Sequence, residues 1–304
     1  MMKKILIVGG SGTIGSAFIK EFYDKYEFSS ISRNELMQAE LKLKFPKVNI
    51  YFSDIESQDN LTTIFSKVKP DVVIHMAAMK HVNLAEENPI NACKVNVLGS
   101  LNVISASVRA NVPMTIAIST DKACFPENVY GYSKSLMEQC FHEANTTQNK
   151  FAVCRFANVA NTNGSVIPFW LNQKEKGESL KLTDKNMNRL MFSQTSAVNL
   201  IHDTIKHCEK HGGGFTASTF MKSVNMYELA KTISADVEIV GLRPGERLNE
   251  KLMSKRELPY TYIENDLIIL KKQLNQNENK LNTEYSSESA EKMSVSEMLE
   301  LINE

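Results

Sequence analysis

The chain has 304 residues with 35 basic and 35 acidic side chains, so its formal net charge is zero. Without a net positive charge, the chain has no overall field to attract nucleic acid or an anionic membrane surface, and we expect neither as a partner. Its hydrophobic content of 42% is that of a globular protein, and no apolar run approaches the roughly 18 residues of a membrane span. The five cysteines are scattered without a paired spacing, which argues against a disulfide framework and a zinc site and favours a reducing cytoplasm.

Short β-rich runs alternate with longer segments of helical periodicity through the first half of the chain. We predict strands over Lys3–Val8, Phe28–Ser32, Val48–Ser53, Asp71–His75, Met114–Ser119 and Phe151–Phe156. We predict helices between them over Thr13–Lys25, Glu35–Lys44, Asn60–Lys67, Pro89–Ala110 and Tyr130–Thr146. This alternation is typical of βαβ units, so the fold class predicted is α/β, a doubly wound parallel sheet of Rossmann type. Its ligand crevice lies beyond the carboxyl ends of the strands.

The regular alternation of strands and helices ends after residue 157. Loop-rich stretches follow at 161–164 and 211–214, and one more helix is predicted at 195–209. We therefore divide the chain into a dinucleotide-binding domain (1–157), a smaller substrate-binding region that caps it (158–270), and a polar segment with a C-terminal helix (271–304). Ser294 and Glu297 have the spacing of a capping box, which predicts where that last helix begins.

A glycine-rich turn follows the first predicted strand and opens the first predicted helix. Gly9 permits the tight turn, Gly12 lets backbone N–H groups approach a pyrophosphate at the helix N-terminus, and Gly15 allows close packing of helix on sheet. This context predicts a dinucleotide cofactor over a merely structural turn.

The second strand ends in Ser32 and Arg33, where NAD-binding proteins carry an acidic residue. A guanidinium makes charge-assisted hydrogen bonds to a 2′-phosphate that a carboxylate would repel, so the pair favours NADP. The alternative is a solvated arginine on a loop. Asp54, after the third strand, is a candidate acceptor for the adenine amino group or a plain turn residue.

Tyr130 and Lys134 lie four residues apart, on one face of a predicted helix. A nearby ammonium lowers a phenol pKa, which makes Tyr130 a candidate base for an alcohol proton. At the end of the fifth strand, Thr120 can hydrogen-bond the same hydroxyl, while Asp121 and Lys122 offer an acid and a base side by side. The alternative for the last two is an exposed surface ion pair.

Together these motifs resemble the extended short-chain dehydrogenase/reductases, specifically the soluble UDP-N-acetylglucosamine 4,6-dehydratases that invert C5. The resemblance covers nearly the whole chain and is supported by the stretches His75–Val82, Asn96–Gly99, Asn158–Val159, Gly164–Pro168 and Arg243–Glu246. It implies a UDP-hexosamine substrate, NADP as the cofactor, and a homo-oligomer.

The resemblance also implies a mechanism. C4 of the sugar is oxidised with NADP, Lys122 removes the C5 hydrogen, Asp121 protonates the leaving C6 hydroxyl, and hydride returns to C6. In the branch of the family that feeds pseudaminic acid, C5 is inverted. A lysine base requires a pKa well below about 10.4, which burial near Lys80 and Lys134 would favour, and Asp121 must keep its proton.

Binding residues are carried over from the family by position. Arg243 offers a guanidinium fork for a diphosphate; the alternative is that the Arg243–Glu246 turn only shapes a loop. His75 and His81 have no partner at metal spacing, so no metal is predicted. The cofactor residues are Gly9, Ser11, Gly12, Thr13, Ile14, Gly15, Ser32, Arg33, Asp54, Ile55, Ala77, Ala78, Lys80, Asn96, Tyr130 and Lys134; the substrate residues are Lys80, Asn158, Ser165, Val166, Arg189, Arg243 and Glu246.

Two other functions stay open at this point. The same groups would serve a reductase and C5-epimerase acting on a UDP-4-keto-5,6-ene hexosamine made by a separate dehydratase. A non-catalytic NADP-binding protein would share the fold, since fold alone does not establish activity. A 4-epimerase is less favoured because rotation of a 4-keto intermediate needs no Asp–Lys pair.

Overall fold

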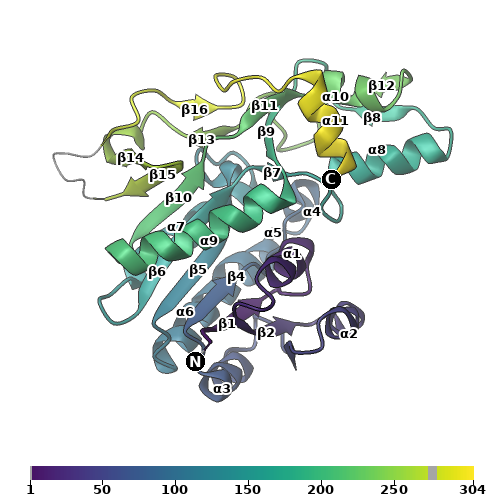
Figure 1. Cartoon of the computed structure of the whole chain (residues 1–304). Helices are drawn as coiled ribbons and strands as arrows, with labels where there is room; N and C mark the ends of the chain where they lie inside the picture. Colours follow the sequence, from purple (N-terminus) through teal and green to yellow (C-terminus); the bar gives the residue numbers. More distant parts are fainter. Residues whose placement is uncertain (1, 273–278) are drawn as a thin grey trace.

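A nine-stranded sheet forms the centre of the computed structural model, which describes residues 2–272 and 279–304 (Figure 1). Seven strands are parallel, and the two at one edge, β14 and β15, run antiparallel to their neighbours. The order is β14 (Thr261–Glu264), β15 (Leu267–Lys271), β10 (Phe215–Thr219), β6 (Lys150–Phe156), β5 (Met114–Thr120), β4 (Val72–His75), β1 (Lys4–Val8), β2 (Glu27–Ser32) and β3 (Asn49–Phe52).

Helices cover both faces of this sheet, which explains why its central strands are apolar throughout. On one face lie α1 (Thr13–Glu21), α2 (Glu35–Lys44) and α9 (Gln194–His211); on the other lie α3 (Gln58–Val68), α6 (Gly99–Arg109) and α7 (Val129–Ala144). In β1, Ile5 and Ile7 join the core beneath α1 and α9, whereas Leu6 and Val8 join the core beneath α3 and α6. The predicted doubly wound α/β fold is confirmed.

All six predicted strands and the helices between them are present, with ends that shift by a few residues. The largest difference is the helix predicted over Pro89–Ala110. It consists of α5 (Pro89–Cys93), a π-helical turn η1 (Lys94–Leu98) and α6, preceded by α4 (Val82–Glu87). The wide turn contains Asn96, whose side chain bonds the loop after β4. Such π-turns often occur at functional sites.

The second half of the chain builds a smaller lobe and also extends the main sheet, because β10, β15 and β14 lie beside β6. The division at residue 157 therefore does not separate two sheets. The smaller lobe holds β7 (Asn158–Val159), α8 (Val166–Glu175), β8 (Leu180–Leu182), β9 (Asn188–Phe192), β11 (Lys222–Asn225), α10 (Met226–Ile233), β12 (Val237–Ile239) and α11 (Val295–Asn303). The strands β13 (Lys251–Met253) and β16 (Tyr285–Ser286) lie beside it, and η3 (Leu258–Tyr260) directly precedes β14.

The C-terminal helix begins as predicted. Ser294 Oγ accepts a hydrogen bond from Glu297 N at 3.4 Å, and the Glu297 carboxylate accepts from Ser294 N at 2.8 Å, which completes the capping box. Part of the predicted polar segment, residues 273–278, lies outside the described residues. Within residues 2–272 and 279–304, the search for a helix with the length and hydropathy of a membrane span finds none.

A buried cluster of ion-paired side chains joins the first half of the chain to the second. Arg155 of β6 donates to Glu138 Oε2 at 2.6 Å, to Glu257 Oε1 at 2.9 Å and to the Leu252 carbonyl at 2.8 Å. We expect Arg155→Met to lower the free energy of unfolding by about 3–5 kcal/mol, since two buried carboxylates lose their counter-ion. Urea denaturation measures this.

The exposed pair between Lys206 and Asp203, 2.9 Å apart, provides the control. Lys206→Met should change the free energy of unfolding by less than about 0.5 kcal/mol. If Arg155→Met changed the free energy of unfolding as little as Lys206→Met, the buried cluster would not be a main contributor to the stability of the fold.

Candidate active site

Two cavities meet beyond the carboxyl ends of the parallel strands. The first, about 370 Å³, runs from the glycine turn to the end of β5 and is called the glycine cleft. The second, about 330 Å³, lies against the smaller lobe and contains Arg189 and Arg243; it is called the arginine cavity. Lys80, Lys122 and Asn158 line both, with Val159 and Thr162, so a ligand in one cavity would touch a ligand in the other.

The glycine cleft begins at the turn between β1 and α1. Gly9 has a φ of 93°, and a Cβ there would lie 2.9 Å from the backbone nitrogen of Ala77, so a side chain is excluded. At the start of α1, Gly12 provides no side-chain cap, which leaves backbone N–H donors facing the cleft. This donor set fits a pyrophosphate. The predicted cofactor residues that line the cleft are Gly9, Gly12, Thr13, Ile14, Gly15, Ala78, Lys80, Tyr130 and Lys134.

The predicted recognition residues for the adenosine half lie side by side at the ends of β2 and β3. Arg33 Nη1 is 3.2 Å from Asp54 Oδ2, and 71% of the Arg33 side chain is exposed. Ser32 Oγ accepts a hydrogen bond from Asn34 N at 3.2 Å. Arg33 is therefore an exposed side chain paired with Asp54. The predicted cofactor residues that do not line the cleft are Ser11, Ser32, Arg33, Asp54, Ile55, Ala77 and Asn96.

Asn96 does not line the cleft itself but bonds the loop after β4. From the π-turn, its Oδ1 accepts from Met79 N at 2.8 Å, and its Nδ2 donates to the Met79 carbonyl at 3.0 Å and to Ser133 Oγ at 2.9 Å. These bonds fix the loop that carries Lys80, whose Nζ donates to the Asn163 carbonyl at 2.6 Å.

The Thr120–Asp121–Lys122 triplet forms a compact group where the cavities meet. Asp121 Oδ1 accepts from Thr120 Oγ1 at 2.8 Å and from Lys122 Nζ at 3.0 Å. The Asp121 side chain is fully buried, and its Oδ2 has no hydrogen-bond partner among the described residues. A buried oxygen of this kind is ready to bond a ligand. The solvated surface pair considered from the sequence is excluded.

Tyr130 reaches this group because α7 approaches very closely. A Cβ on Gly131 would lie 2.5 Å from the Lys122 carbonyl, so only glycine allows the helix to pack on η2 (Asp121–Ala123). Asn128 caps α7 by accepting from Gly131 N at 2.7 Å and donates to the Gly245 carbonyl at 2.9 Å. The same residue thus joins the start of α7 to the turn that carries Arg243.

The electrostatics of Lys122 differ from the prediction. Burial acts to lower the pKa of Lys122, but the carboxylates of Asp121 and Glu250, 3.0 and 3.8 Å from Nζ, raise it above its usual value overall. Arg189 opposes them, rather than the Lys80 and Lys134 that the sequence suggested. In this structure the lysine is held charged between two acids.

The pKa of Tyr130 also differs from the prediction. Burial raises it to about 12, and the opposing effects of Lys122 and of a hydrogen bond with Thr120 are smaller. Lys134, expected to lower it, donates instead to the Ile118 carbonyl at 2.6 Å, and burial lowers the pKa of Lys134 itself to about 8. The cation that favours the phenolate is therefore Lys122.

Glu250 is a site residue that the sequence reasoning missed. It is 2% exposed and lines the arginine cavity, and burial raises its pKa. Its position, four residues beyond Glu246 and directly before β13 (Lys251–Met253), was the available signal. A carboxylate placed at the start of a buried strand must find a partner, which here is Lys122.

The predicted substrate residues all line the arginine cavity. Arg189 is buried, and its guanidinium donates to the carbonyls of Leu248 and Arg247 at 3.1 and 2.9 Å, which fixes its plane. Arg243 is exposed, and its backbone N–H donates to Glu246. The seven residues are Lys80, Asn158, Ser165, Val166, Arg189, Arg243 and Glu246.

Comparison with known proteins agrees with this geometry. A family model described as polysaccharide biosynthesis protein matches residues 5–272. The chain is 35% identical over 272 residues to the UDP-N-acetylglucosamine 4,6-dehydratase (inverting) of Campylobacter jejuni, covering 86% of this chain and 80% of that protein. It is 31% identical over 274 residues to the UDP-glucose 4-epimerase of Rickettsia canadensis, covering 84% and 79%.

A solved structure shares the whole architecture. The X-ray structure of Pen from Bacillus thuringiensis superimposes with a TM-score of 0.90 at 29% identity, covering 99% of this chain and 96% of that one. Sequence family, fold and site thus agree. The chain belongs to the polysaccharide biosynthesis protein family and is a nucleotide-sugar-modifying enzyme of the extended short-chain dehydrogenase/reductase superfamily.

Proposed function

We propose that this enzyme is an NADP-dependent UDP-N-acetylglucosamine 4,6-dehydratase. The observation that carries the proposal is that the glycine cleft and the arginine cavity join at Lys122, beside Asp121 and Tyr130. A sugar that spans this junction would meet a phenol, a carboxyl group and an amine together. When bound in the glycine cleft, NADP supplies the chemistry of accepting hydride from C4 and returning it to C6.

Tyr130 is placed to take the proton of the C4 hydroxyl. Because burial raises its pKa to about 12, Tyr130 rests as the neutral phenol and must first release its own proton to act as the base. The Lys122 ammonium and the Thr120 hydroxyl favour the phenolate, so both contribute to making the tyrosine a base. Lys134, held by the Ile118 carbonyl, lines the cleft beside it.

One proton shift within the Asp121–Lys122 pair prepares the elimination. Transfer of a proton from Nζ to Asp121 Oδ1, across 3.0 Å, turns the lysine into a neutral base and the aspartate into an acid at once. Lys122 then removes the C5 proton, and Asp121 protonates the C6 hydroxyl, which leaves as water. Oδ1 delivers the proton to this hydroxyl, and Oδ2, buried and unpaired within the described residues, can accept a hydrogen bond from the substrate. A proton is redelivered to C5 when hydride returns to C6.

The UDP moiety is assigned to the arginine cavity, so that residues 158–270 contribute most of the nucleotide-sugar contacts. The Arg243 guanidinium is exposed at the rim, where it can meet two phosphate oxygens. Asn158 lies at the junction with the cleft, near the expected position of the sugar.

We also propose that the enzyme forms a homo-oligomer through the outer faces of α6 and α7. Large apolar side chains are exposed there, which a partner copy would cover. They are Leu101 and Val108 of α6 with Tyr132 and Leu136 of α7.

The reductase and C5-epimerase remains the second candidate, because the Asp121–Lys122 pair serves that reaction equally well. Incubation of the enzyme with UDP-N-acetylglucosamine and analysis of the product by mass spectrometry separate the two. The proposal predicts a product lighter by one water. A sugar of unchanged mass would exclude the dehydratase.

Cofactor preference tests the role of Arg33. We expect Arg33→Ala to weaken NADP binding by about tenfold and to leave NAD binding unchanged, because only NADP has the 2′-phosphate that the guanidinium would bond. Fluorescence titration with both cofactors measures this. Equal losses for the two would contradict the assignment.

A further inference from the structure

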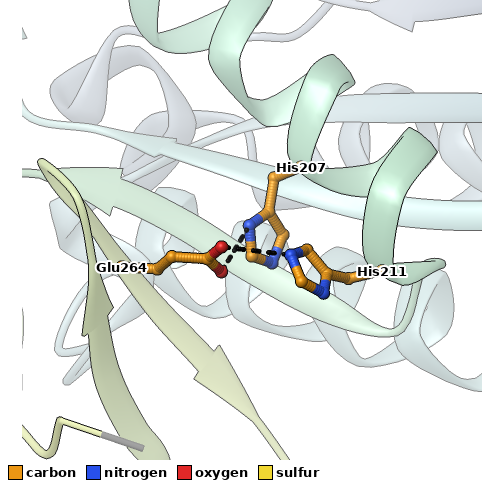
Figure 2. A group of neighbouring side chains, drawn as sticks. All are labelled: His207, His211 and Glu264. Atoms are coloured by element: carbon orange, nitrogen blue, oxygen red, sulfur yellow. Dashed lines mark hydrogen bonds and ion pairs between the residues drawn. The ribbon is translucent and has the colours of Figure 1, made fainter.

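Three side chains converge far from the active-site cavities, where α9 ends beside the hairpin of β14 and β15 (Figure 2). His207 and His211 are one helical turn apart on α9 and point the same way, and Glu264 reaches them from the end of β14. His207 Nδ1 is 3.3 Å from Glu264 Oε2, and His211 Nε2 is 3.1 Å from Glu264 Oε1. The nitrogen and oxygen atoms that these three residues could offer to a metal ion all lie within 4.8 Å of one another.

We propose that His207, His211 and Glu264 form a binding site for a divalent transition-metal ion of the zinc type. Two imidazoles and one carboxylate are a frequent ligand set for Zn²⁺, which binds nitrogen and oxygen at about 2.0–2.2 Å. In a tetrahedron of that size, neighbouring ligand atoms lie about 3.4 Å apart. The two histidine–carboxylate separations, 3.3 and 3.1 Å, are close to this value, and no pair of ligand atoms is more than 4.8 Å apart, so an ion would enter with small movements of the side chains.

The surroundings of His207 are those of an oriented ligand. The ring is 5% exposed, and its other nitrogen, Nε2, lies 3.4 Å from the hydroxyl of Tyr262 on the same hairpin. A hydrogen bond to the second ring nitrogen is the usual device that fixes a metal-binding histidine.

The other side of the cluster is open to solvent. The side chains of His211 and Glu264 are 34% and 26% exposed, and a surface cavity lined by His207 and Glu264 lies alongside. An ion can therefore reach the site and keep water as a fourth ligand.

One group competes with a metal ion. Lys210 Nζ lies 3.0 Å from Glu264 Oε1, so the ammonium occupies a carboxylate oxygen that the ion would use. The Lys210 side chain is 70% exposed and can turn into solvent without losing packing. Lys210 therefore competes with a metal ion for the Glu264 carboxylate, and we expect that removing this lysine strengthens metal binding.

The bound ion would act on stability rather than on catalysis. It would link the C-terminal end of α9 to the hairpin that forms one edge of the main sheet, and none of its ligands lines the glycine cleft or the arginine cavity. This inference is independent of the proposed reaction.

The test is titration of the metal-stripped protein with Zn²⁺ at neutral pH by isothermal calorimetry, together with thermal unfolding. Because the exposed thiol of Cys93 could also bind Zn²⁺, every variant carries Cys93→Ser. We expect one ion per chain, a midpoint of unfolding that rises with Zn²⁺ concentration, and no response to Mg²⁺. His211→Asn should weaken binding by about tenfold or more.

Two lysine variants test whether Lys210 competes with Zn²⁺ for Glu264. Lys210→Met should bind Zn²⁺ several-fold more tightly, whereas Lys206→Met, on the same helix but paired with Asp203, should match the parent. The proposal is overturned if no Zn²⁺ binds, or if His211→Asn and Lys210→Met bind it as the parent does. The cluster would then be an ion pair that joins helix and hairpin without a metal.

Discussion

Replacing Tyr130 with phenylalanine is expected to lower turnover of UDP-N-acetylglucosamine by about 10²–10⁴-fold while NADP stays bound. The phenol is the only group of the site placed to take the C4 hydroxyl proton with support from both Thr120 and Lys122 among the described residues. Phenylalanine fills the same space, so the cleft keeps its shape. Product formation by mass spectrometry and NADP binding by calorimetry provide the two readouts.

Tyr260→Phe is the matched control, since Tyr260 is exposed and lines neither cavity. It should turn over like the parent. Retention of more than a tenth of the parental activity in Tyr130→Phe would refute the role of Tyr130 as the base.

Replacing Lys122 should have an effect of similar size on a different step. We expect Lys122→Met to reduce water loss by about 10³-fold, because no other described amine is paired with Asp121 at the end of β5. The same variant should lose exchange of the C5 hydrogen with solvent. Reaction in deuterium oxide, followed by mass spectrometry of the sugar, measures both.

Lys122→Arg distinguishes a base from a simple cation. A guanidinium keeps the positive charge beside Asp121 and Tyr130, but it does not release a proton near neutral pH. Water loss and C5 exchange should stay abolished in this variant. If arginine restored either of them, Lys122 would act through its charge alone and the proposed proton shift would be wrong.

The sheet and the glycine turn could be predicted because their signals are local. A continuous apolar run such as Ile5–Val8 specifies a strand buried on both faces, and glycines at fixed spacing specify the turn that follows. The extension of the sheet by β10, β14 and β15 depends on pairings between distant segments, which no local period reveals. The π-turn around Asn96 likewise depends on its bonds to the loop after β4.

The electrostatics of the site were the least predictable part. Sequence spacing places Tyr130 near Lys134, but the fold directs the Lys134 ammonium to the Ile118 carbonyl. It also brings Glu250 to Lys122 from more than a hundred residues away, which raises a lysine pKa that was expected to fall. Tertiary contacts decide which charged groups meet. The residue types alone therefore predicted the acid, the base and the phenol of the site, but not the directions of their pKa shifts.

The central claim is that one hexose ring lies across the junction of the two cavities. A crystal structure of the Tyr130→Phe variant with NADP and UDP-N-acetylglucosamine tests it most directly. We expect the uridine diphosphate in the arginine cavity, C4 facing the nicotinamide in the glycine cleft, and Lys122 Nζ within about 3.5 Å of C5, near-attack range. A sugar bound with C5 turned away from Lys122 and Asp121 would contradict the account.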